Sequence, residues 1–541
     1  MKKIKKLISL LAIFTLVAFV FTGCGSNDTE RTQTDGTSFT YWCTFDANAL
    51  ASGVESYADM LMFREMEKRT GVSISFEHPI QGSTGNEAFL TMLATSKRPD
   101  MIEYWWSNYT GGPQAAIDDQ VIVCLDDYLK EYAPNFYDYM EGEKGKENAY
   151  RWKLQATTDE GSYYGFNVLN IGTTKGFAGL YVRADKLKDW GMEVPQTIDD
   201  WTALFAKAKT AGFQKPFVCD NNTLSFKSDS IHSFNTAFDV GKNLYVEDGK
   251  VVFAPFQKGY KEYVAQITEW IKAGYIDTGF PTNDKAKIEG NMANGISVAT
   301  HGYVGSGIGK ILPAVQNIDP NADFVACPYP VAKSGDKARF QMMYEEATDN
   351  AIAISTTCGN YEKAISWCDY RYCEEGSTLQ IFGIEGDTFT VEERDGEKHF
   401  VYTDKILKPE TSGVNSVTEA LYKYMQPCNY PGLNQHPDYL DGYYPYGAQK
   451  DAIRIWNENS ELAKEHKLPT LSFTEDERNE INDIKEIAEV QLEVDISDIM
   501  LGKKSIDTYD AAIASAKDND YDRLIAIYQA AYDRYLSKLD V

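Results

Sequence analysis

The chain has 541 residues, of which 53 are Lys or Arg and 80 are Asp or Glu, so its formal net charge is −27 at pH 7. This acidic balance argues against nucleic acid and against polyanionic ligands as partners. It does not indicate a disordered acidic chain, because 13% of the residues are aromatic and no long acidic block occurs. One hydrophobic core stops growing at about 250–300 residues, so we expect at least two lobes.

The first 24 residues have the layout of a secretory signal. Four lysines within the first six residues precede the apolar run Leu7–Phe21, and Thr22-Gly23 precede Cys24. Residues 21–24 resemble the bacterial lipobox, whose cysteine is acylated and becomes the new N-terminus. A transmembrane anchor is the alternative, but the apolar run is shorter than the ~20 residues that a spanning helix needs. The sequence predicts a signal peptide at 1–23, lipidation of Cys24, including palmitate, and a tether at 24–37.

Strands and helices alternate after the tether. The patterns predict strands at Ser38–Trp42, Val72–Phe76 and 100–106, a turn at 46–48, a helix ending before Gly71 and a second helix at 87–95. Strand, helix, strand, helix, strand is typical of a parallel sheet with crossover helices. Ligands of such sheets bind beyond the carboxyl ends of the strands. Trp42, Trp105 and Trp106 stand at the ends of two of these strands.

A second group of elements begins near residue 179. Residues 179–183 are a candidate strand, and Thr197 is placed to cap a following helix through Asp200, where the capping pattern usually has Glu. Trp201, Leu204, Phe205 and Ala208 would form the apolar face of that helix. Trp270, Trp367 and Trp456 also lie in helical patterns, and we expect all four helical tryptophans to be buried.

Three segments resemble a known family. The run Leu180–Lys209, LYVRADKLKDWGMEVPQTIDDWTALFAKAK, resembles the second-lobe entry of family-1 extracellular solute-binding proteins. Asn360–Asp387, NYEKAISWCDYRYCEEGSTLQIFGIEGD, and Ile499–Tyr535 resemble segments of the large lipoprotein branch of that family, the carbohydrate-binding lipoproteins of ABC importers. Together with the lipobox, these segments occur in the family's order and spacing.

The resemblance implies an α/β fold of the periplasmic-binding-protein type II, with two lobes and the ligand cleft between them. The N-terminal lobe would comprise 38–166 plus 305–375, and the C-terminal lobe 167–304 plus 376–541. The protein would be a monomer, held by its lipid on the extracellular face of the cytoplasmic membrane. It would capture a carbohydrate, most plausibly a neutral oligosaccharide, by hinge closure and deliver it to the permease subunits of an ABC transporter, without catalysis and without a cofactor.

Sugar recognition needs flat apolar faces for stacking and polar groups for the hydroxyls, which makes Trp42, Trp105 and Trp106 candidates. One of the last two should enter the core, because neighbours on a strand face opposite ways. The segment Gly295–Gly307 resembles the family's strand that ends in a ligand-facing loop, which would put His301 and Tyr303 near the cleft. The family also tends to place binding residues before the apolar strand 351–354, which adds Glu345 and Asp349. The tyrosine-rich stretches 430–432 and 438–447 would either line an extended cleft or pack as surface loops.

Motifs for other chemistry do not occur. Besides Cys24, eight cysteines are scattered without a CxxC pair, which indicates free thiols and no zinc site. No nucleophile elbow, phosphate loop or zinc-protease motif occurs. Asp518, Asp520 and Asp522 alternate but lack the glycine and final Glu of a calcium loop, so a helix boundary is the better interpretation. A peptide-binding lipoprotein, an anchored glycoside hydrolase and a sensor partner remain alternatives.

Overall fold

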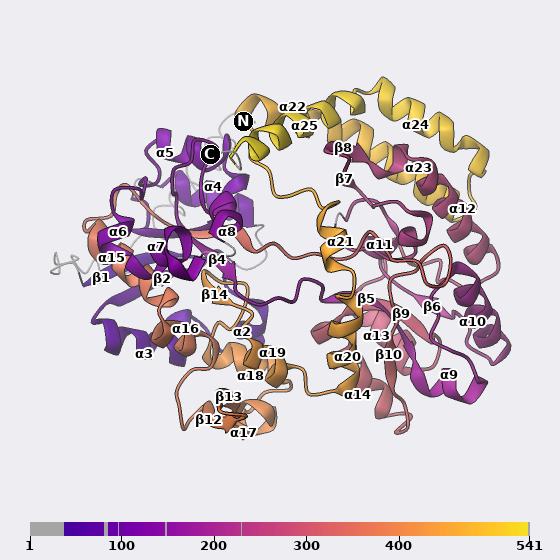
Figure 1. The fold of residues 1–541 in the computed structure, drawn as a ribbon, viewed down its shortest axis with the longest axis horizontal. Coiled ribbons are helices and arrows are strands. Elements are labelled where there is room, and N and C mark those ends of the chain that lie inside the picture. The colour runs from indigo at the N-terminus through magenta and orange to yellow at the C-terminus, as the bar shows by residue number, and fades with distance from the viewer. Residues whose placement is uncertain (1–36, 81–84, 96, 146–148, 229, 539–541) are drawn as a thin grey trace, which may run out of the picture.

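The structure is a computed structural model that describes residues 37–80, 85–95, 97–145, 149–228 and 230–538. The predicted signal peptide, the lipidation site Cys24 and residues 24–36 of the tether lie outside the described residues. Two lobes lie side by side, each built around its own sheet (Figure 1). Within the described part of the chain, no helix is both long and apolar enough to span a membrane.

The first lobe contains a six-stranded sheet in the order β14-β4-β11-β3-β1-β2. Its strands are β1 (Ser38–Trp42), β2 (Ser73–Glu77), β3 (Met101–Trp105), β4 (Phe166–Asn170), β11 (Ala347–Ile354) and β14 (Gly432–Asn434). β1 runs parallel to β2 and β3, as the sequence predicts, and β11 is antiparallel to β3 and β4. The carboxyl ends of β1, β2 and β3 therefore share one edge with the start of β11.

Helices surround the first sheet and bury their apolar faces against it. They are α2 (Ala47–Ala51), α3 (Leu61–Thr70), α4 (Gly85–Leu93), α5 (Gly112–Asp118), α6 (Leu129–Tyr132), α7 (Pro134–Glu141), α8 (Ala149–Ala156), α15 (Tyr361–Asp369), α16 (Glu374–Ile381), α18 (Val417–Tyr424) and α19 (Pro437–Tyr443). A hairpin of β12 (Phe389–Arg394) and β13 (Glu397–Tyr402), followed by α17 (Asp404–Leu407), completes this lobe. Gly71 ends α3 in the left-handed conformation, with φ of 68°.

The second lobe contains a four-stranded sheet in the order β10-β5-β9-β6. Its strands are β5 (Ala178–Arg183), β6 (Phe217–Val218), β9 (Ala299–Tyr303) and β10 (Phe324–Ala326), and β7 (Leu244–Glu247) pairs with β8 (Lys250–Phe253) beside it. Its helices are α9 (Ala184–Trp190), α10 (Ile198–Thr210), α11 (Asn221–Leu224), α12 (Lys258–Lys272), α13 (Lys285–Ala293), α14 (Lys310–Gln316), α20 (Gly447–Trp456) and α21 (Ser460–Lys464).

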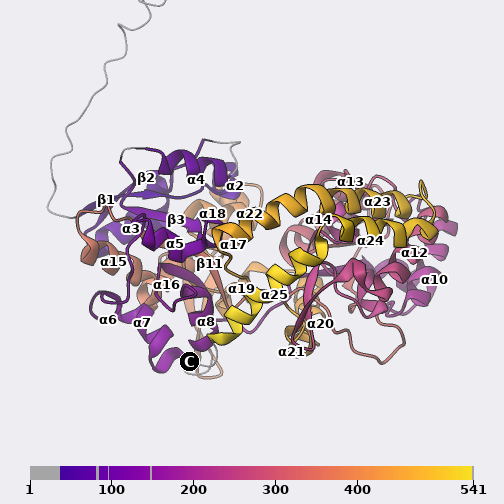
Figure 2. The same ribbon diagram turned by 90° about the horizontal axis from the view of Figure 1, so that it is seen from above.

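Four C-terminal helices pack on the second lobe and extend toward the first. They are α22 (Glu475–Ile484), α23 (Val490–Met500), α24 (Tyr509–Asp518) and α25 (Tyr521–Ser537), and a π-helical segment, η9 (Lys485–Glu489), joins α22 to α23. Seen from above, α25 runs from the second lobe to the first, where it ends near α8 (Figure 2). The three alternating aspartates mark the boundary between α24 and α25, which confirms the helix-boundary interpretation.

The predicted cap of α10 is confirmed. The hydroxyl of Thr197 accepts a hydrogen bond from the backbone N–H of Asp200 at 3.2 Å, and the carboxylate of Asp200 accepts one from the N–H of Thr197 at 2.9 Å. Trp201, Leu204 and Phe205 are fully buried in the second core. An Asp at this position therefore closes the capping box that Glu usually forms.

The predicted turn at 46–48 is wrong. Asp46 instead caps the short helix α2, because its carboxylate accepts a hydrogen bond from the N–H of Asn48 at 2.6 Å. Asp and Asn favour both turns and helix N-termini, so the local pattern did not distinguish the two.

The packing differs from the predicted lobes in three segments. Residues 305–340 are predicted for the N-terminal lobe, but β10 pairs with β5 in the second sheet, with Phe324 opposite Arg183, and Phe340 lies in the second core. Residues 167–170 are predicted for the C-terminal lobe, but they belong to β4 of the first sheet. Residues 376–443 were assigned to the C-terminal lobe, but Phe382, Tyr402 and Tyr439 lie in the first core. Local patterns specify a helix or strand, but the sheet that it joins is fixed by contacts between residues distant in the sequence.

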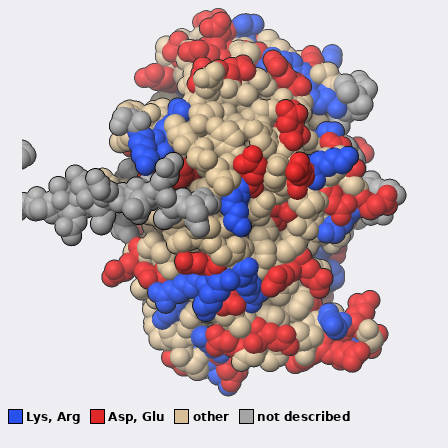
Figure 3. All heavy atoms as spheres, turned by 90° about the vertical axis from the view of Figure 1, so that its left-hand side faces the viewer, with Lys and Arg blue, Asp and Glu red and all other residues tan. Residues whose placement is uncertain are grey.

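Acidic side chains are spread over the outer face of the first lobe, with lysines and arginines between them, and they do not form one block (Figure 3). This distribution agrees with the absence of an acidic tail in the sequence.

Candidate functional site

The two sheets face each other across the segments that join the lobes. One such segment leaves β4 at Asn170 and enters β5 at Ala178, and another leads into β11 at Ala347. These segments hydrogen-bond to each other, since the N–H of Tyr344 donates to the carbonyl of Lys175 at 2.7 Å. The carboxyl edge of the first sheet is therefore the edge that points toward the second lobe, as expected for a ligand site of an α/β sheet.

Trp105 is the exposed tryptophan of this edge. It is the last residue of β3, and 49% of its surface is accessible. Leu50 in α2, which follows β1, and Ile80, which follows β2, are also exposed, at 42% and 86%. Large apolar side chains are thus exposed at or after the ends of three neighbouring parallel strands, and Trp105 offers a flat exposed ring at the strand end itself.

The assignments of Trp42 and Trp106 as ligand contacts are corrected by the structure. Trp106 has no exposed surface, and its indole N–H donates to the carbonyl of Ala351 at 3.0 Å. Trp42 is 4% exposed and packs edge-on against Phe89, with ring centroids 5.9 Å apart. Both rings belong to one hydrophobic cluster with Phe89. Successive residues of β1 and β3 are buried, so both faces of this part of the sheet are covered.

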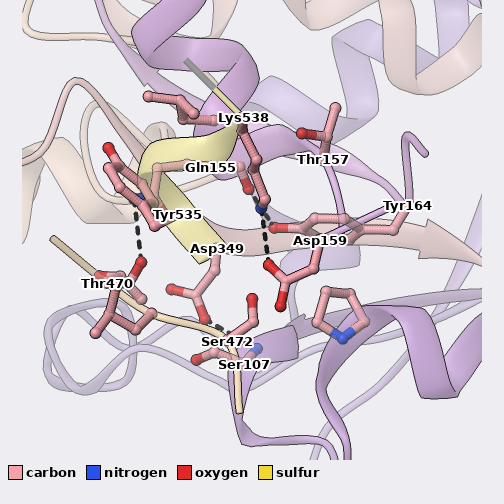
Figure 4. Close-up of a pocket in the computed structure, with 13 residues that line it drawn as sticks. Ser107, Gln155, Thr157, Asp159, Tyr164, Asp349, Thr470, Ser472, Tyr535 and Lys538 are labelled. Atoms are coloured by element: carbon pink, nitrogen blue, oxygen red, sulfur yellow. Dashed lines mark hydrogen bonds and ion pairs between the residues drawn. The ribbon is translucent and has the colours of Figure 1, made fainter. Parts of the chain in front are cut away.

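A polar pocket lies between the first lobe and the C-terminal helices (Figure 4). Its walls come from Ser107 after β3, from residues 154–164 around the end of α8, from 470–472, and from the last turn of α25. Gln155 donates to the carbonyl of Thr470 at 3.5 Å. Lys538 forms an ion pair with Asp159 at 3.0 Å. The pocket is thus built from segments that belong to both lobes.

Asp349 is the predicted site residue that lines this pocket. Its side chain is directed at Ser107 and Ser472 (Figure 4). It is 6% exposed, and its carboxylate accepts a hydrogen bond from the N–H of Ser107 at 3.0 Å. Burial raises the pKa of the Asp349 carboxyl, and the hydrogen bonds from Ser107 partly offset that shift. Asp349 is therefore a buried acceptor that orients the strand-end loop beside Trp105.

Arg478 reaches the same loop from α22 of the second lobe. Its guanidinium donates to the carbonyl of Ser107, and its buried Nε has no hydrogen-bond partner among the described residues. Burial lowers the pKa of Arg478. Sequence reasoning missed this residue, because Arg478 stands in a run of charged residues that reads as a solvated helix face. No local signal would have identified it.

Glu345 lies in the joining segment but is already paired. Its carboxylate is 2.5 Å from the ammonium of Lys467. The neighbouring Glu346 is 3.8 Å from Lys464. Both carboxylates therefore link this joining segment to the segment that follows α20, and contact with a hydroxyl ligand would have to share Glu345 with Lys467.

His301 and Tyr303 lie on β9 of the second sheet and differ in exposure. Tyr303 ends the strand and is half-buried. His301 is 7% exposed, and its Nε2 is buried without a partner among the described residues. Burial, together with the charge of Lys242, lowers the pKa of His301 to about 3. Burial also lowers the pKa of Lys242 to about 7. His301 therefore belongs to a buried polar cluster behind the edge.

The tyrosine-rich loops are mostly packed. Tyr430 is buried and its hydroxyl lies 3.0 Å from that of Tyr57, while Tyr439 stacks on Tyr443 with ring centroids 5.4 Å apart. Trp201, Trp270, Trp367 and Trp456 are all buried, as predicted.

The structure therefore brings Trp105 and Asp349 together at one edge, with Tyr303 on the opposing sheet. No group of three His, Cys, Asp or Glu side chains suited to a metal occurs among the residues that the structure describes. The eight described cysteines are unpaired.

No family model matches the sequence, and no curated protein matches it. Solved structures do match over nearly the whole chain. The alginate-binding protein AlgQ2 without calcium ion is 16% identical, with a TM-score of 0.68, and the match covers 92% of this chain and 99% of that chain. An HMO-binding, ABC-transporter-associated solute-binding protein from Bifidobacterium longum infantis is 15% identical, with a TM-score of 0.71 and coverage of 93% and 99%.

The substrate-binding protein FusA of an S. pneumoniae ABC transporter, in complex with kestose, is 18% identical, with a TM-score of 0.68 and coverage of 92% and 99%. These identities are low, so the likeness shows the fold alone. The chain has the two-lobed α/β fold of these solute-binding proteins, which confirms the fold expected from the family resemblance.

Proposed function

We propose that the protein is a solute-binding protein of an ABC importer that captures a neutral oligosaccharide between its two lobes. The observation that carries the proposal is Trp105, an exposed ring at the carboxyl edge of the first sheet that faces the second lobe. Proteins of the same fold bind carbohydrates: one is described as alginate-binding, one as HMO-binding, and one was solved in complex with kestose. The last two are associated with ABC transporters. The acidic balance of the chain favours a neutral ligand over an anionic one.

The mechanism that this fold supports is closure of one lobe on the other. Ligand first stacks on Trp105, and the lobes then close, so that Tyr303 and the joining segment cover it. The ligand shifts the population toward the closed form because it binds that form more tightly than the open form. No covalent step is needed. The closed form is the one that a permease would accept.

The direct test is a thermal-shift screen of the chain lacking residues 1–24. The panel contains kestose, fructo-nystose, Man5GlcNAc, alginate oligosaccharides, monosaccharides and short peptides. A ligand that binds only the folded state stabilises it by about 2.7 kcal/mol at a hundredfold excess over its dissociation constant. We expect a shift with one series of neutral oligosaccharides, and the sugar should be recovered unchanged afterwards.

Other outcomes of this screen contradict the proposal. Shifts with peptides alone would indicate a peptide-binding lipoprotein, and a shift with alginate alone would contradict the preference for neutral sugars. Conversion of the sugar to smaller products would indicate a glycoside hydrolase.

We also propose that Cys24 carries the lipid that holds the protein on the extracellular face of the membrane. Two acyl chains are needed for stable anchoring, since one chain binds only marginally. Radiolabelled palmitate should enter the wild-type chain in its own host cells and should not enter Cys24→Ala, which should appear in the medium. Equal labelling of both chains would overturn this assignment.

A further inference from the structure

One helix on the outside of the second lobe exposes a continuous apolar stripe. Ile487 is 61% exposed, Val490 is 49% exposed and Val494 is 48% exposed. They lie in η9 and α23, which continue α22 without a break, and their spacing places them on successive turns of one helix face. Elsewhere in the described chain, no helix exposes more than one large apolar side chain.

The stripe is not part of the core. The opposite face of the same helix buries Ile484, Leu492 and Ile496 in the second core, so the helix is already fixed without the stripe. Single exposed apolar residues are normal on a protein surface, but a continuous set on one face indicates contact with another molecule. The stripe leads away from the edge that carries Trp105, because the helix continues from Arg478, beside Ser107, into α23 on the far rim of the second lobe (Figure 1).

Negative charge flanks the N-terminal half of the stripe. Asp483 and Glu486 precede Ile487 and Val490 by four residues each, which places each carboxylate beside an apolar side chain on the helix surface. Both residues are exposed, and neither has an ion-pair partner among the described residues. At the other end, the nearby carboxylate of Asp498 is paired with Lys503 at 3.0 Å. Lys485 lies between the two acids, but its ammonium lies 3.2 Å from the hydroxyl of Tyr528. The acidic side chains without an ion pair among the described residues are therefore at the 483–486 end.

The negative charge beside the stripe decides which kind of molecule can bind there. A second copy of the chain carries the same net charge of −27 and so offers no general positive complement to these acids, and an anionic lipid surface would repel them. A protein that presents an apolar recess with Lys or Arg beside it would be complementary both to the apolar stripe and to its flanking negative charge. We propose that Ile487, Val490 and Val494, with Asp483 and Glu486, form the docking surface for such a protein partner. This inference does not depend on the proposed function.

The test is photocrosslinking in the protein's own host cells. The full chain carries p-benzoylphenylalanine at position 490. The control chain carries it at position 318, because Ile318, in the turn after α14, is 63% exposed and α14 exposes no large apolar side chain. We expect a discrete adduct with another protein at position 490, identified by mass spectrometry, and none at 318. Its yield should fall about fivefold or more when Asp483→Lys and Glu486→Lys are introduced, because the charges then repel.

Two further variants keep the test sharp. Ile487→Ser with Val494→Ser should lower the adduct yield at position 490, whereas Ile318→Ser should leave it unchanged. All variants alter exposed side chains, so their melting temperatures should match the wild type. An adduct with a second copy or with lipid, no adduct at all, or an adduct insensitive to charge reversal would overturn the proposal.

Discussion

Trp105 and Trp106 are neighbours in the sequence but have opposite environments. The first is 49% exposed at the edge of the sheet and the second is fully buried. Replacing Trp105 with Ala should therefore weaken binding of the oligosaccharide that shifts the wild type, raising its dissociation constant about tenfold, because a buried aromatic contact is worth more than about 1 kcal/mol. Isothermal titration of the variant measures this change, and its melting temperature should be that of the wild type.

Trp106→Ala is the matched control. Emptying a fully buried indole site costs about 3–5 kcal/mol of folding free energy, so this variant should unfold at lower urea concentration. Its affinity for the same sugar should change less than that of Trp105→Ala when both are measured on folded protein. The opposite order of affinities would show that Trp105 does not contact the ligand.

His301 makes a prediction about acid stability. Its pKa is lowered to about 3 in the folded chain, from an ordinary value of 6.5, chiefly by burial. Between these pH values the unfolded chain binds the extra proton, so stability is lost as pH falls, by up to about 1.4 kcal/mol per pH unit for this group. His301→Gln should reduce that slope by about one proton. Urea unfolding at several pH values between about 4 and 6 measures the difference.

The neighbouring groups supply the control for this experiment. Burial also lowers the pKa of His232 to about 3, and Lys242 carries positive charge beside both imidazoles. His399→Gln, which changes a half-buried histidine paired with Asp438 at 2.7 Å, should leave the slope contributed by His301 in place. An unchanged slope in His301→Gln would show that His301 is already protonated in the folded chain.

The prediction that one of Trp105 and Trp106 enters the core is confirmed. The reason differs from the predicted strand alternation, because Trp106 lies in the 3-10 segment after β3 and the four residues of β3 before Trp105 are all buried. Which of the two enters the core depends on the side of the sheet that the helices cover, and that depends on contacts with distant residues such as Ala351. Arg478 was missed for the same reason, since its partner Ser107 is 371 residues away.

At the scale of elements, strand β5 is held close to helix α20. A Cβ built on Gly179 would lie 2.5 Å from the ring of Trp456, which is fully buried. Gly179→Ala should therefore cost about 1–3 kcal/mol, because the ring cannot retreat without moving the core. Gly290→Ala in α13 is the control, since nothing lies within 4 Å of its added Cβ.

The free energy of unfolding should fall in Gly179→Ala and rise in Gly290→Ala. Ala in place of a helical Gly reduces the entropy of the unfolded chain and stabilises by about 0.4–1 kcal/mol. Equilibrium urea unfolding compares both with the wild type. A neutral Gly179→Ala would mean that α20 is free to shift away from β5.

Elements were predictable where the hydrophobic period and the stop signals agree. The strands at 38–42 and 101–105, the stop at Gly71 and the cap at Thr197 all follow from local chemistry. The short helix α2 was not predicted, because five residues carry too little periodic signal and Asp46 is equally suited to a turn.

At the scale of the whole molecule, the order of elements predicted two α/β lobes, but not which lobe each late segment joins. Residues 376–443 return to the first core, and 305–340 stay with the second lobe. No local rule separates these outcomes, since amphipathic helices can cover either sheet. The same holds for the candidate site. Its position at the strand ends was predictable from the sequence, but the pocket walls at 470–472 and on α25 were not, because they depend on contacts between distant segments.

The last helix, α25, connects the two lobes and yields the final prediction. Tyr521, Leu524 and Ile527 fix its first half in the second core. Its end contacts the first lobe at Asp159, which lies 3.0 Å from Lys538 and 3.7 Å from Arg534. The side chain of Lys538 is 12% exposed. A partly buried pair of this kind is worth up to about 1 kcal/mol, or about fivefold in an opening equilibrium. Asp159→Asn should therefore reduce the hydrogen-exchange protection of residues 533–538 about fivefold.

Protection of residues 524–531 should stay unchanged in Asp159→Asn, because the second core and not the ion pair holds that part of α25. Asp522→Asn removes an exposed pair with Lys517, 3.4 Å long, at the other end of the same helix and should not affect 533–538. If Asp159→Asn leaves 533–538 fully protected, the pair of Arg534 and Glu477, 2.6 Å apart, is sufficient to hold the helix end. If protection falls as expected, the ion pairs of Asp159 hold the end of α25 on the first lobe, and α25 couples the movements of the two lobes.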